Sequence, residues 1–410
     1  MGRDGSFHFL LYSAGISFIF SDFREAGVVM METVSVTCAK GIAPILADEL
    51  RALGVNVLRE EVALVEVETD FAGACRLCLH LRTAHRVLWP VTRARVSHPN
   101  ALFGALVRYP WEQHLNPEGY LRVHGHVRTD SIRDERFAFL TVKDAVMDRM
   151  RDRHGKRPDS GSDDRGVNLY LHWVEDDARL YFDLAGQPLS RRGYRLQGGS
   201  APLQEALAAA MLLCGGYDGT VPLVNPMCGS GTLAIEAALI ARNQASGLLR
   251  DNFGFFHLRE YDAQGWQKEV FAARTAIRPA YEVPVIVAGD IDPAAISAAK
   301  ANAVRAGVED LIQFETVDYR ETQLPEGKTW IVLNPEYGER MGADRELEAH
   351  YREIGAWLKS ANTGGKGLVI SGNLPLAKRF GLKLSGRHTL FNGGMECRLL
   401  MFDLFKPAEK

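Results

Sequence analysis

The strongest constraint on the fold of this chain is an alternation of short apolar runs with helix-forming segments between residues 201 and 405. Runs such as 283–288 and 329–333 are typical of buried strands, and a segment such as 293–306, with Pro at its start and Gly after its end, is typical of a helix. A strand–helix–strand order predicts a parallel sheet with helices on both faces. We therefore expect an α/β fold in this part of the chain.

The expected elements of this region follow one another closely. The pattern predicts strands at 221–224, 283–288, 329–333 and 367–371, and helices at 202–213, 232–242, 293–306 and 346–359. Upstream, residues 41–53 and 70–81 have helical spacing, and residues 62–69 read as a strand between them. That predicts a small α+β unit over about 33–90. Cys75 and Cys78 fall on the inner face of the second helix, which favours a core position over a metal site.

Residues 82–160 carry a local excess of positive charge. Between Arg82 and Ser160 there are 15 Lys and Arg against 9 Asp and Glu, whereas the whole chain of 410 residues has a net charge of −3. We expect a half-exposed strand at 121–128 and a helix at 137–150. The residues expected to face inward from that helix are Leu140, Val142, Ala145, Val146 and Met150. A charge run is usually a solvated face, but this clustering indicates phosphate contact. Its members are Arg149, Arg151, Arg153, Lys156 and Arg157, followed by Arg191, Arg192 and Arg195.

The length of the chain suggests two or three domains, and its composition is that of a globular protein. Six cysteines without a disulfide framework fit a reducing compartment, so we expect a cytoplasmic protein. The apolar run at 7–20 is too short to span a membrane and lacks the features of a signal peptide. Residues 1–32 are interpreted as an extension from a mis-assigned start, with an amphipathic addition as the alternative.

A Gly-rich turn links the first strand of the α/β region to its first helix. It reads Asn225-Pro226-Met227-Cys228-Gly229-Ser230-Gly231-Thr232. Glycines at this position let a ligand approach the backbone, and the N–H groups of the helix N-terminus bind a carboxylate or a phosphate. A tight connection is the alternative. The turn has no Lys of a phosphate loop and no Gly-x-Gly-x-x-Gly, which disfavours nucleoside triphosphatases and NAD-dependent oxidoreductases.

Three further polar sites follow predicted strands: Asp290 after 283–288, Asp318 at the end of another predicted strand around 314–318, and Asn334 after 329–333. Asp290 is placed to bind ribose hydroxyls, whereas Asp292, before Pro293, reads as a helix N-cap. Asp318 could accept a hydrogen bond from an adenine amine, or be an ordinary loop residue. Ligands of open α/β sheets bind outside the carboxyl ends of the strands, so these positions should share one edge.

The last of these sites is Asn334-Pro335-Glu336-Tyr337. The Asn334 side chain and a main-chain carbonyl, that before Tyr337 or that of Pro335, could accept hydrogen bonds from an exocyclic amine, and the Tyr337 ring could stack on a base. Taken alone, Asn-Pro is also a turn former.

Together these motifs resemble the bacterial 23S rRNA guanine-N2 methyltransferases that carry a THUMP domain, a family often labelled N6-adenine-specific methylases. The resemblance covers residues 33–405 and rests on 225–238, on 192–195 with 201–209, on 142–145 and on 392–400. It implies a ferredoxin-like subdomain over 33–90, a THUMP RNA-binding domain over 91–190, and a Rossmann-like methyltransferase domain over 191–410 whose last strand is antiparallel. Asn225 and Glu336 depart from the family's Asp and Pro.

The resemblance also implies S-adenosylmethionine as cofactor and methylation of a guanine N2 amine, without a metal or a membrane. It assigns the cofactor to Pro202, Asn225, Met227, Cys228, Gly229, Gly231, Thr232, Asp290 and Asp318. It assigns the target base to Asn334, Pro335 and Tyr337. Structured RNA would contact Lys143, Arg149, Arg153, Lys156, Arg157 and Arg192. The expected RNA is rRNA; tRNA guanine-N2 methylation, adenine-N6 methylation and a non-catalytic RNA-binding assembly factor remain alternatives.

Overall fold

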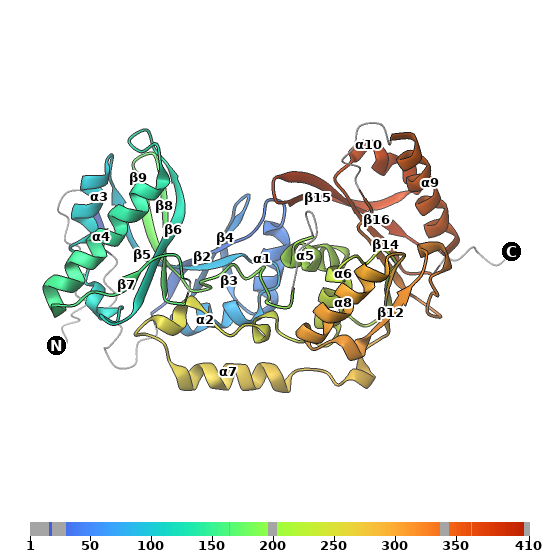
Figure 1. Cartoon of the computed structure of the whole chain (residues 1–410), viewed down its shortest axis with the longest axis horizontal. Coiled ribbons are helices and arrows are strands. Elements are labelled where there is room, and N and C mark those ends of the chain that lie inside the picture. The colour runs from blue at the N-terminus through green and yellow to red at the C-terminus, as the bar shows by residue number, and fades with distance from the viewer. Residues whose placement is uncertain are drawn as a thin grey trace, which may run out of the picture.

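The computed structural model of this chain describes residues 16–18, 30–163, 165–195, 203–336, 344–361 and 363–405. Two sheets organise them, one in each half of an elongated molecule (Figure 1). The N-terminal half holds a nine-stranded sheet, and the C-terminal half holds a seven-stranded sheet. Among the described helices, none is long and apolar enough to cross a lipid bilayer.

The N-terminal sheet runs in the order β3-β4-β2-β5-β9-β8-β6-β7, with β1 paired to β5. Its strands are β1 (Ile16–Phe18), β2 (Glu32–Thr37), β3 (Asn56–Glu60), β4 (Leu64–Thr69), β5 (Arg86–Arg95), β6 (Tyr120–Arg128), β7 (Asp159–Ser160), β8 (Val167–Val174) and β9 (Asp177–Asp183). The long strand β5 pairs with β2 on one side and with β9 on the other. The two expected N-terminal units therefore share one continuous sheet, which the sequence did not predict.

Four helices pack on this sheet: α1 (Ala43–Ala52), α2 (Phe71–His80), α3 (Pro99–Leu106) and α4 (Glu135–His154). The expected helices at 41–53 and 70–81 are confirmed, and Cys75 and Cys78 are buried on α2 as expected. On α4, Val142, Ala145, Val146 and Met150 are buried, but Leu140 is 49% exposed, so its inward assignment was wrong. The buried residues of this helix are Ala138, Val142, Ala145, Val146, Met147 and Met150, and Leu140 lies outside the face that they form.

The C-terminal sheet runs in the order β12-β11-β10-β13-β14-β16-β15. Its strands are β10 (Leu223–Asn225), β11 (Ile286–Asp290), β12 (Ile312–Thr316), β13 (Trp330–Leu333), β14 (Lys366–Ser371), β15 (Leu384–Asn392) and β16 (Met395–Asp403). Strands β10 to β14 pair in parallel, whereas β16 lies antiparallel to β14. The expected parallel sheet and its antiparallel last strand are both confirmed.

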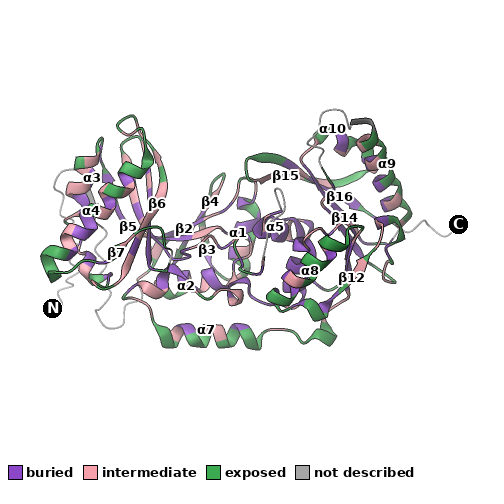
Figure 2. Ribbon diagram, viewed as in Figure 1, coloured by how far each residue is buried: buried purple, intermediate pink, exposed green. Residues whose placement is uncertain are grey.

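Helices cover both faces of this sheet. They are α5 (Glu205–Gly215), α6 (Thr232–Ala241), α8 (Pro293–Ala306), α9 (Asp344–Ala361) and α10 (Leu374–Ala377). The helix α7 (Ala263–Thr275) instead packs against α2 of the N-terminal half. Alternate residues of β13 point to opposite faces, because side chains of a strand alternate. Val332 joins the core that includes α5, α6 and α8, while Ile331 and Leu333 join a second core with α9. Figure 2 shows the buried strands between their partly exposed helices.

The two halves of the molecule meet in a buried seam. One hydrophobic core runs through both halves, from β2 to the helices of the C-terminal sheet. The Ser246 hydroxyl donates to the Leu81 carbonyl at 2.9 Å, and the Arg82 guanidinium donates to the Gln244 carbonyl at 2.9 Å. These hydrogen bonds join residues more than 160 positions apart, so the seam depends on contacts that no local pattern encodes.

Candidate functional site

The turn after β10 is held by main-chain hydrogen bonds at the edge of the C-terminal sheet. The Cys228 N–H donates to the Gly289 carbonyl, and the Gly229 N–H donates to Oδ2 of Asp290, both at 2.9 Å. Gly229 has φ +52°, and a Cβ added there would meet open space. The missing side chain therefore leaves room beside the backbone, as a ligand-binding turn requires.

Gly231 performs a different task in the same turn. It caps α6 with φ +83°, and a Cβ there would lie 2.9 Å from the Cβ of Ala299 on α8. A glycine is therefore required here because a side chain would clash with the neighbouring helix α8. The next residue, Thr232, is buried, and its hydroxyl accepts a hydrogen bond from Arg195 at 3.1 Å. Met227 is half-buried and Cys228 buried, where desolvation raises the pKa of the Cys228 thiol to about 12.

The surroundings of Asn225 explain why this chain has Asn where the family has Asp. Its side chain is fully buried, and its amide nitrogen donates to the Val332 carbonyl of β13 at 2.9 Å. An ionised Asp has no donor for that carbonyl, and its charge would be desolvated there. The amide thus ties β10 to β13. Its Oδ1 is buried without a hydrogen-bond partner among the described residues, so an acceptor remains beneath the turn.

Asp290 and Asp292 have the two different environments that the sequence suggested. Asp290 ends β11, and its Oδ1 and Oδ2 accept hydrogen bonds from the N–H groups of Asp292 and Gly229. Asp292 caps α8 by accepting from the Ala294 N–H at 2.8 Å, which confirms the N-cap expectation. Asp290 lies beside the open position at Gly229, so it is the acidic group best placed to face a ligand.

Asp318 follows β12 at the same edge but is engaged locally. Its carboxylate accepts from the Arg320 N–H at 2.9 Å and makes a two-pronged contact with the Arg320 guanidinium. These hydrogen bonds lower the pKa of Asp318. Its contact with an adenine amine stays a prediction, and the loop interpretation accounts for the bonds seen here.

Asn334 and Pro335 follow β13, the strand next to β10. Asn334 is half-buried, Pro335 buried and Glu336 exposed. The Glu336 carbonyl accepts a hydrogen bond from the hydroxyl of Tyr351 on α9 at 3.0 Å. This carbonyl, which precedes Tyr337, is therefore already engaged, which favours the Pro335 carbonyl as the main-chain acceptor for an amine. Tyr337 and Pro202 lie outside the described residues.

Tyr351 was missed by sequence reasoning. It is fully buried and its hydroxyl also lies 3.3 Å from the Ser371 hydroxyl at the end of β14. Burial raises the pKa of this phenol. The helical spacing of α9 predicts an inward aromatic residue here, but nothing local indicates that its hydroxyl reaches the segment after β13. Tyr351 therefore positions that segment through a long-range contact.

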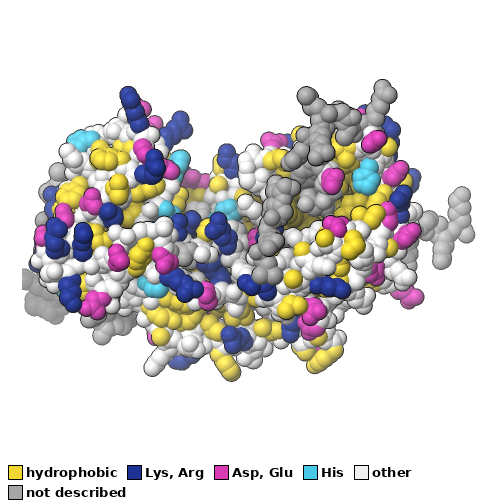
Figure 3. Space-filling model, viewed as in Figure 1, with side chains coloured by type: hydrophobic (Ala, Val, Ile, Leu, Met, Phe, Trp, Pro, Cys, Tyr) yellow, Lys and Arg dark blue, Asp and Glu magenta, His cyan; other side chains and the backbone are white. Residues whose placement is uncertain are grey.

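The predicted RNA-contacting residues divide into surface and interior groups. Arg153, Lys156 and Arg157 are exposed near the C-terminal end of α4, and Lys143 is partly exposed. Arg149 is only 17% exposed and binds Glu112 at 2.6 Å. Figure 3 shows Lys and Arg side chains on the N-terminal half of the molecule and near its middle, where the two halves meet.

Arg192 corrects the sequence expectation. Its side chain is fully buried, where it donates to the carbonyls of Arg82 and Leu189 and lies 3.5 Å from the carboxylate of Glu236. The hydroxyl of Tyr194 also donates to Glu236 at 3.1 Å. A buried guanidinium cannot contact RNA, so Arg192 belongs to the seam between the two halves. No local pattern distinguishes Arg192 from its exposed neighbour Arg191.

The strand order, the glycine turn after the first parallel strand and the acidic residue after the second define a Rossmann-like methyltransferase fold. The solved structure of SMU.472 in complex with SAH has this fold, with a TM-score of 0.82 at 24% identity, covering 93% of this chain and 99% of the other. A structure described as a predicted N6-adenine-specific DNA methylase from Listeria monocytogenes has a TM-score of 0.80 at 29% identity, covering 92% and 97%.

Residues 192–401 match the family described as "RMKL-like, methyltransferase domain", and the chain belongs to that family. Residues 33–88 match the RlmL ferredoxin-like domain, and residues 97–183 match the THUMP domain. The resemblance seen in the motifs is thereby confirmed. The cofactor of the family is S-adenosylmethionine, and the open position at Gly229 beside Asp290 fits it.

Curated relatives match along nearly the whole chain. A protein named ribosomal RNA large subunit methyltransferase K/L from Syntrophotalea carbinolica is 40% identical over 377 residues, which are 90% of this chain and 53% of the relative. A protein of the same name from Methylococcus capsulatus is 36% identical over 374 residues, 90% of this chain and 50% of the relative. The chain thus spans about half the length of the curated relatives it matches.

Proposed function

We propose that this protein transfers a methyl group from S-adenosylmethionine to the N2 amine of a guanosine in 23S rRNA. The observation that carries the proposal is the arrangement of Asn334 and Pro335 next to the glycine turn, on neighbouring strands of one sheet. An amine acceptor and a cofactor turn at one edge suit direct methyl transfer. The THUMP match and the names of the relatives support rRNA as the substrate.

The residues of this chain would act mainly by positioning. S-adenosylmethionine supplies an electrophilic methyl group on a good leaving group, so the protein needs to orient the amine. The Asn334 side chain and the Pro335 carbonyl accept the N–H bonds of the amine and direct its lone pair, while Tyr337 stacks on the base. Correct orientation of two reactants contributes on the order of 7–11 kcal/mol, and stacking roughly 1–3 kcal/mol per base. The base has to leave its helix to reach this edge.

On this proposal Gly229, Asp290 and Asp318 lie along the cofactor, with Asp290 toward the ribose. The exposed Lys and Arg side chains near the end of α4 contact RNA phosphates, and salt weakens that binding. Glu336 is exposed, and its main chain rather than its carboxylate is fixed by Tyr351. We propose that its side chain faces solvent, so that Glu336→Pro changes neither the rate nor the choice of base.

The test is to identify the methylated nucleoside. The purified chain is incubated with S-adenosylmethionine and with rRNA from a strain that lacks the gene, and the digested RNA is analysed by mass spectrometry. The proposal expects N2-methylguanosine in 23S rRNA, lost in Asn334→Ala and retained in Glu336→Pro. Detection of N6-methyladenosine instead would show that the target base is adenine, the base in the name of the Listeria protein. Labelling of tRNA alone would contradict the rRNA assignment.

A second measurement separates an enzyme from an RNA-binding factor. Calorimetry with S-adenosylmethionine is expected to show binding to the wild-type chain. Absence of binding at millimolar ligand would contradict the enzymatic proposal while leaving RNA binding through the THUMP domain intact.

A further inference from the structure

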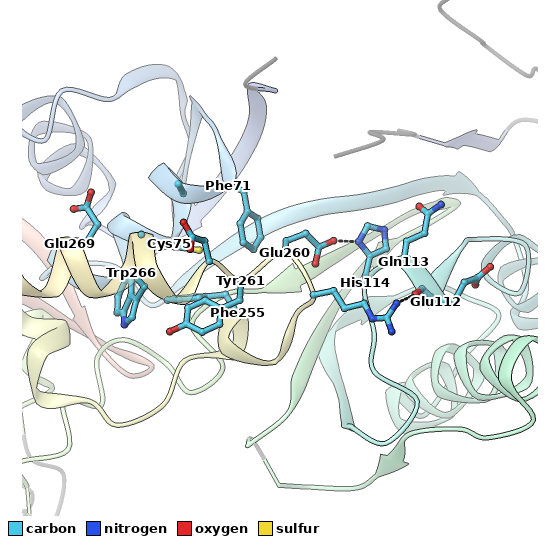
Figure 4. Close-up of a pocket in the computed structure, with 14 residues that line it drawn as sticks. Phe71, Cys75, Glu112, Gln113, His114, Phe255, Glu260, Tyr261, Trp266 and Glu269 are labelled. Carbon is cyan, nitrogen blue, oxygen red and sulfur yellow. Dashed lines mark hydrogen bonds and ion pairs between the residues drawn. The ribbon is translucent and has the colours of Figure 1, made fainter. Parts of the chain in front are cut away.

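A cavity of about 650 Å³ lies where three parts of the molecule meet, away from the glycine turn and Asn334. Its walls come from α2, from the turn Trp111–Gln113 that follows α3, and from α7 with the segment before it (Figure 4). A volume of this size is in the range of small-molecule sites, roughly 300–1,000 Å³. None of the residues assigned to methyl transfer lines this cavity.

One side of the cavity is aromatic. Phe255 is fully buried, Trp266 is 9% exposed, and Tyr261 is half-buried. The Phe255 and Trp266 rings lie 4.9 Å apart between centroids at 70°, and Tyr261 lies 5.9 Å from Phe255. The edge-to-face contact of Phe255 with Trp266 and the tilted contact of Phe255 with Tyr261 hold these rings in place. The cavity therefore has a preformed aromatic wall.

Glu260 brings a carboxylate to this cavity. Its side chain is nine-tenths buried; Oε1 pairs with Nδ1 of His114, and Oε2 is buried without a hydrogen-bond partner among the described residues. The Tyr109 hydroxyl lies 3.0 Å from Nε2 of His114, which fixes the ring from its other side. A buried acceptor without a donor is destabilising. Oε2 of Glu260 could therefore accept a hydrogen bond from a ligand inside the cavity.

The remaining charges make the cavity acidic. Asp262 and Glu269 add two carboxylates to that of Glu260. Glu112 also lines the cavity, but its carboxylate is bound by Arg149 at 2.6 Å. Among the described residues that line the cavity, Arg259 is the one Lys or Arg, and its guanidinium donates to the Glu112 carbonyl at 2.9 Å. Carboxylates therefore outnumber cations, which disfavours a phosphate or a nucleotide.

We propose that this cavity binds a small organic cation, namely an amine or guanidine attached to a hydrocarbon body. The cationic N–H donates to Oε2 of Glu260, and the body packs on Tyr261 and Trp266, where cation–π attraction adds to burial. Because the walls come from α2, the turn after α3 and α7, the bound cation links these parts and stabilises the folded chain.

The first experiment compares the charge of the ligand at constant shape. The full chain is titrated by calorimetry with phenethylamine, agmatine and spermidine, and with 2-phenylethanol and phenylacetate as neutral and anionic counterparts of phenethylamine. At least one amine or guanidine is expected to bind and to raise the unfolding temperature, and phenethylamine to bind at least about tenfold more tightly than its two counterparts. No binding of any cation at millimolar concentration, or equal binding of the three phenyl compounds, would overturn the proposal.

The second experiment alters the cavity. Glu260→Gln keeps the size and the acceptor for His114 but removes the charge, so affinity for the cation should fall roughly tenfold or more. Ala72 is exposed and lines the cavity, so Ala72→Trp should block it without removing an interaction of Glu260. Glu282→Gln, at an exposed position outside the lining, is the matched control. If Glu260→Gln does not fold, Ala72→Trp decides; unchanged affinity in the folded cavity variants contradicts the site.

Discussion

The cofactor edge and the seam between the two halves both bring charged side chains to main-chain groups, but they do so by different means. At the cofactor edge, Asp290 accepts the N–H of Asp292, two positions on in the chain, and the N–H of Gly229, 61 positions earlier in the turn after β10. At the seam, Arg192 donates to the carbonyl of Arg82, which is 110 positions away, and faces the buried Glu236. Short motifs supply the residues of the first region and parallel strand pairing brings them to one edge, whereas no local motif marks the residues of the second.

A charged residue in a sequence does not reveal its partner. Arg191 and Arg192 are adjacent, yet one is exposed and the other is fully buried. Burial raises the pKa of Glu236, and the nearby guanidinium groups of Arg192 and Arg82 oppose that shift. The seam therefore depends on a compensated set of buried charges.

The largest expected effect is at the seam. Arg192→Met leaves Glu236 buried without its closest cation, and breaking a buried pair in this way costs about 3–5 kcal/mol. Urea-induced unfolding measures the loss, with Arg191→Met as the matched control that should stay within about 0.5 kcal/mol of wild type. Equal and small changes in both variants would remove the distinction between buried and exposed arginine at this point.

The two glycines of the cofactor turn should separate stability from binding. Gly231→Ala places a methyl group against Ala299 at positive φ and should cost about 2 kcal/mol of unfolding free energy. Gly229→Ala meets open space, so its cost should be about 1 kcal/mol, but the methyl group occupies the ligand's approach. We expect at least about a tenfold loss of S-adenosylmethionine affinity for Gly229→Ala by calorimetry. A larger loss of affinity in Gly231→Ala would reverse these assignments.

Asp290 and Asp292, at the end of β11 and just after it, should also separate cofactor binding from stability, with smaller effects. Asp290→Asn removes a charged acceptor and should weaken S-adenosylmethionine binding roughly tenfold. Asp292→Ala removes the N-cap of α8 and should cost about 1 kcal/mol of stability while leaving the affinity unchanged. Calorimetry and urea unfolding of both variants measure the two quantities. Weakened binding in Asp292→Ala alone would place the ligand nearer the helix than proposed.

The smallest effect concerns the exposed pair of Asp318 and Arg320. The folded-state pKa of Asp318 is lowered by hydrogen bonds from Arg320, so the stabilisation is present above the ordinary Asp pKa and is lost as the pH falls through the folded value. Arg320 is 59% exposed, so water screens the pair and the difference in unfolding free energy between wild type and Arg320→Gln should be small at pH 7. Urea unfolding at pH 7, 5 and 3 should show it shrinking, with the exposed Lys383→Gln as control. A difference that grows toward low pH would contradict the assignment.

Much of the C-terminal half could be predicted because its signals are local. The helix 293–306 has Asp292 as cap and Gly307 after its end, and the structure has the same bounds. Strand ends carry Asn225, Asp290 and Asn334, and parallel pairing brings β10, β11 and β13 to one edge. The N-terminal half was less predictable, because β5 joins two units into one sheet through β9, a pairing about 90 positions apart.

The strand–helix order, the turn residues and the cap of α8 are encoded locally, because each depends on neighbours within a few positions. The burial of Arg192, the hydrogen bond from the Asn225 amide to the next strand, and the contact of Tyr351 with the segment after β13 arise only when distant segments pack together. The same is true of the cavity around Glu260, whose walls come from three separate stretches of chain. Burial and hydrogen-bond partners depend on which distant segments meet, and local spacing does not contain that information.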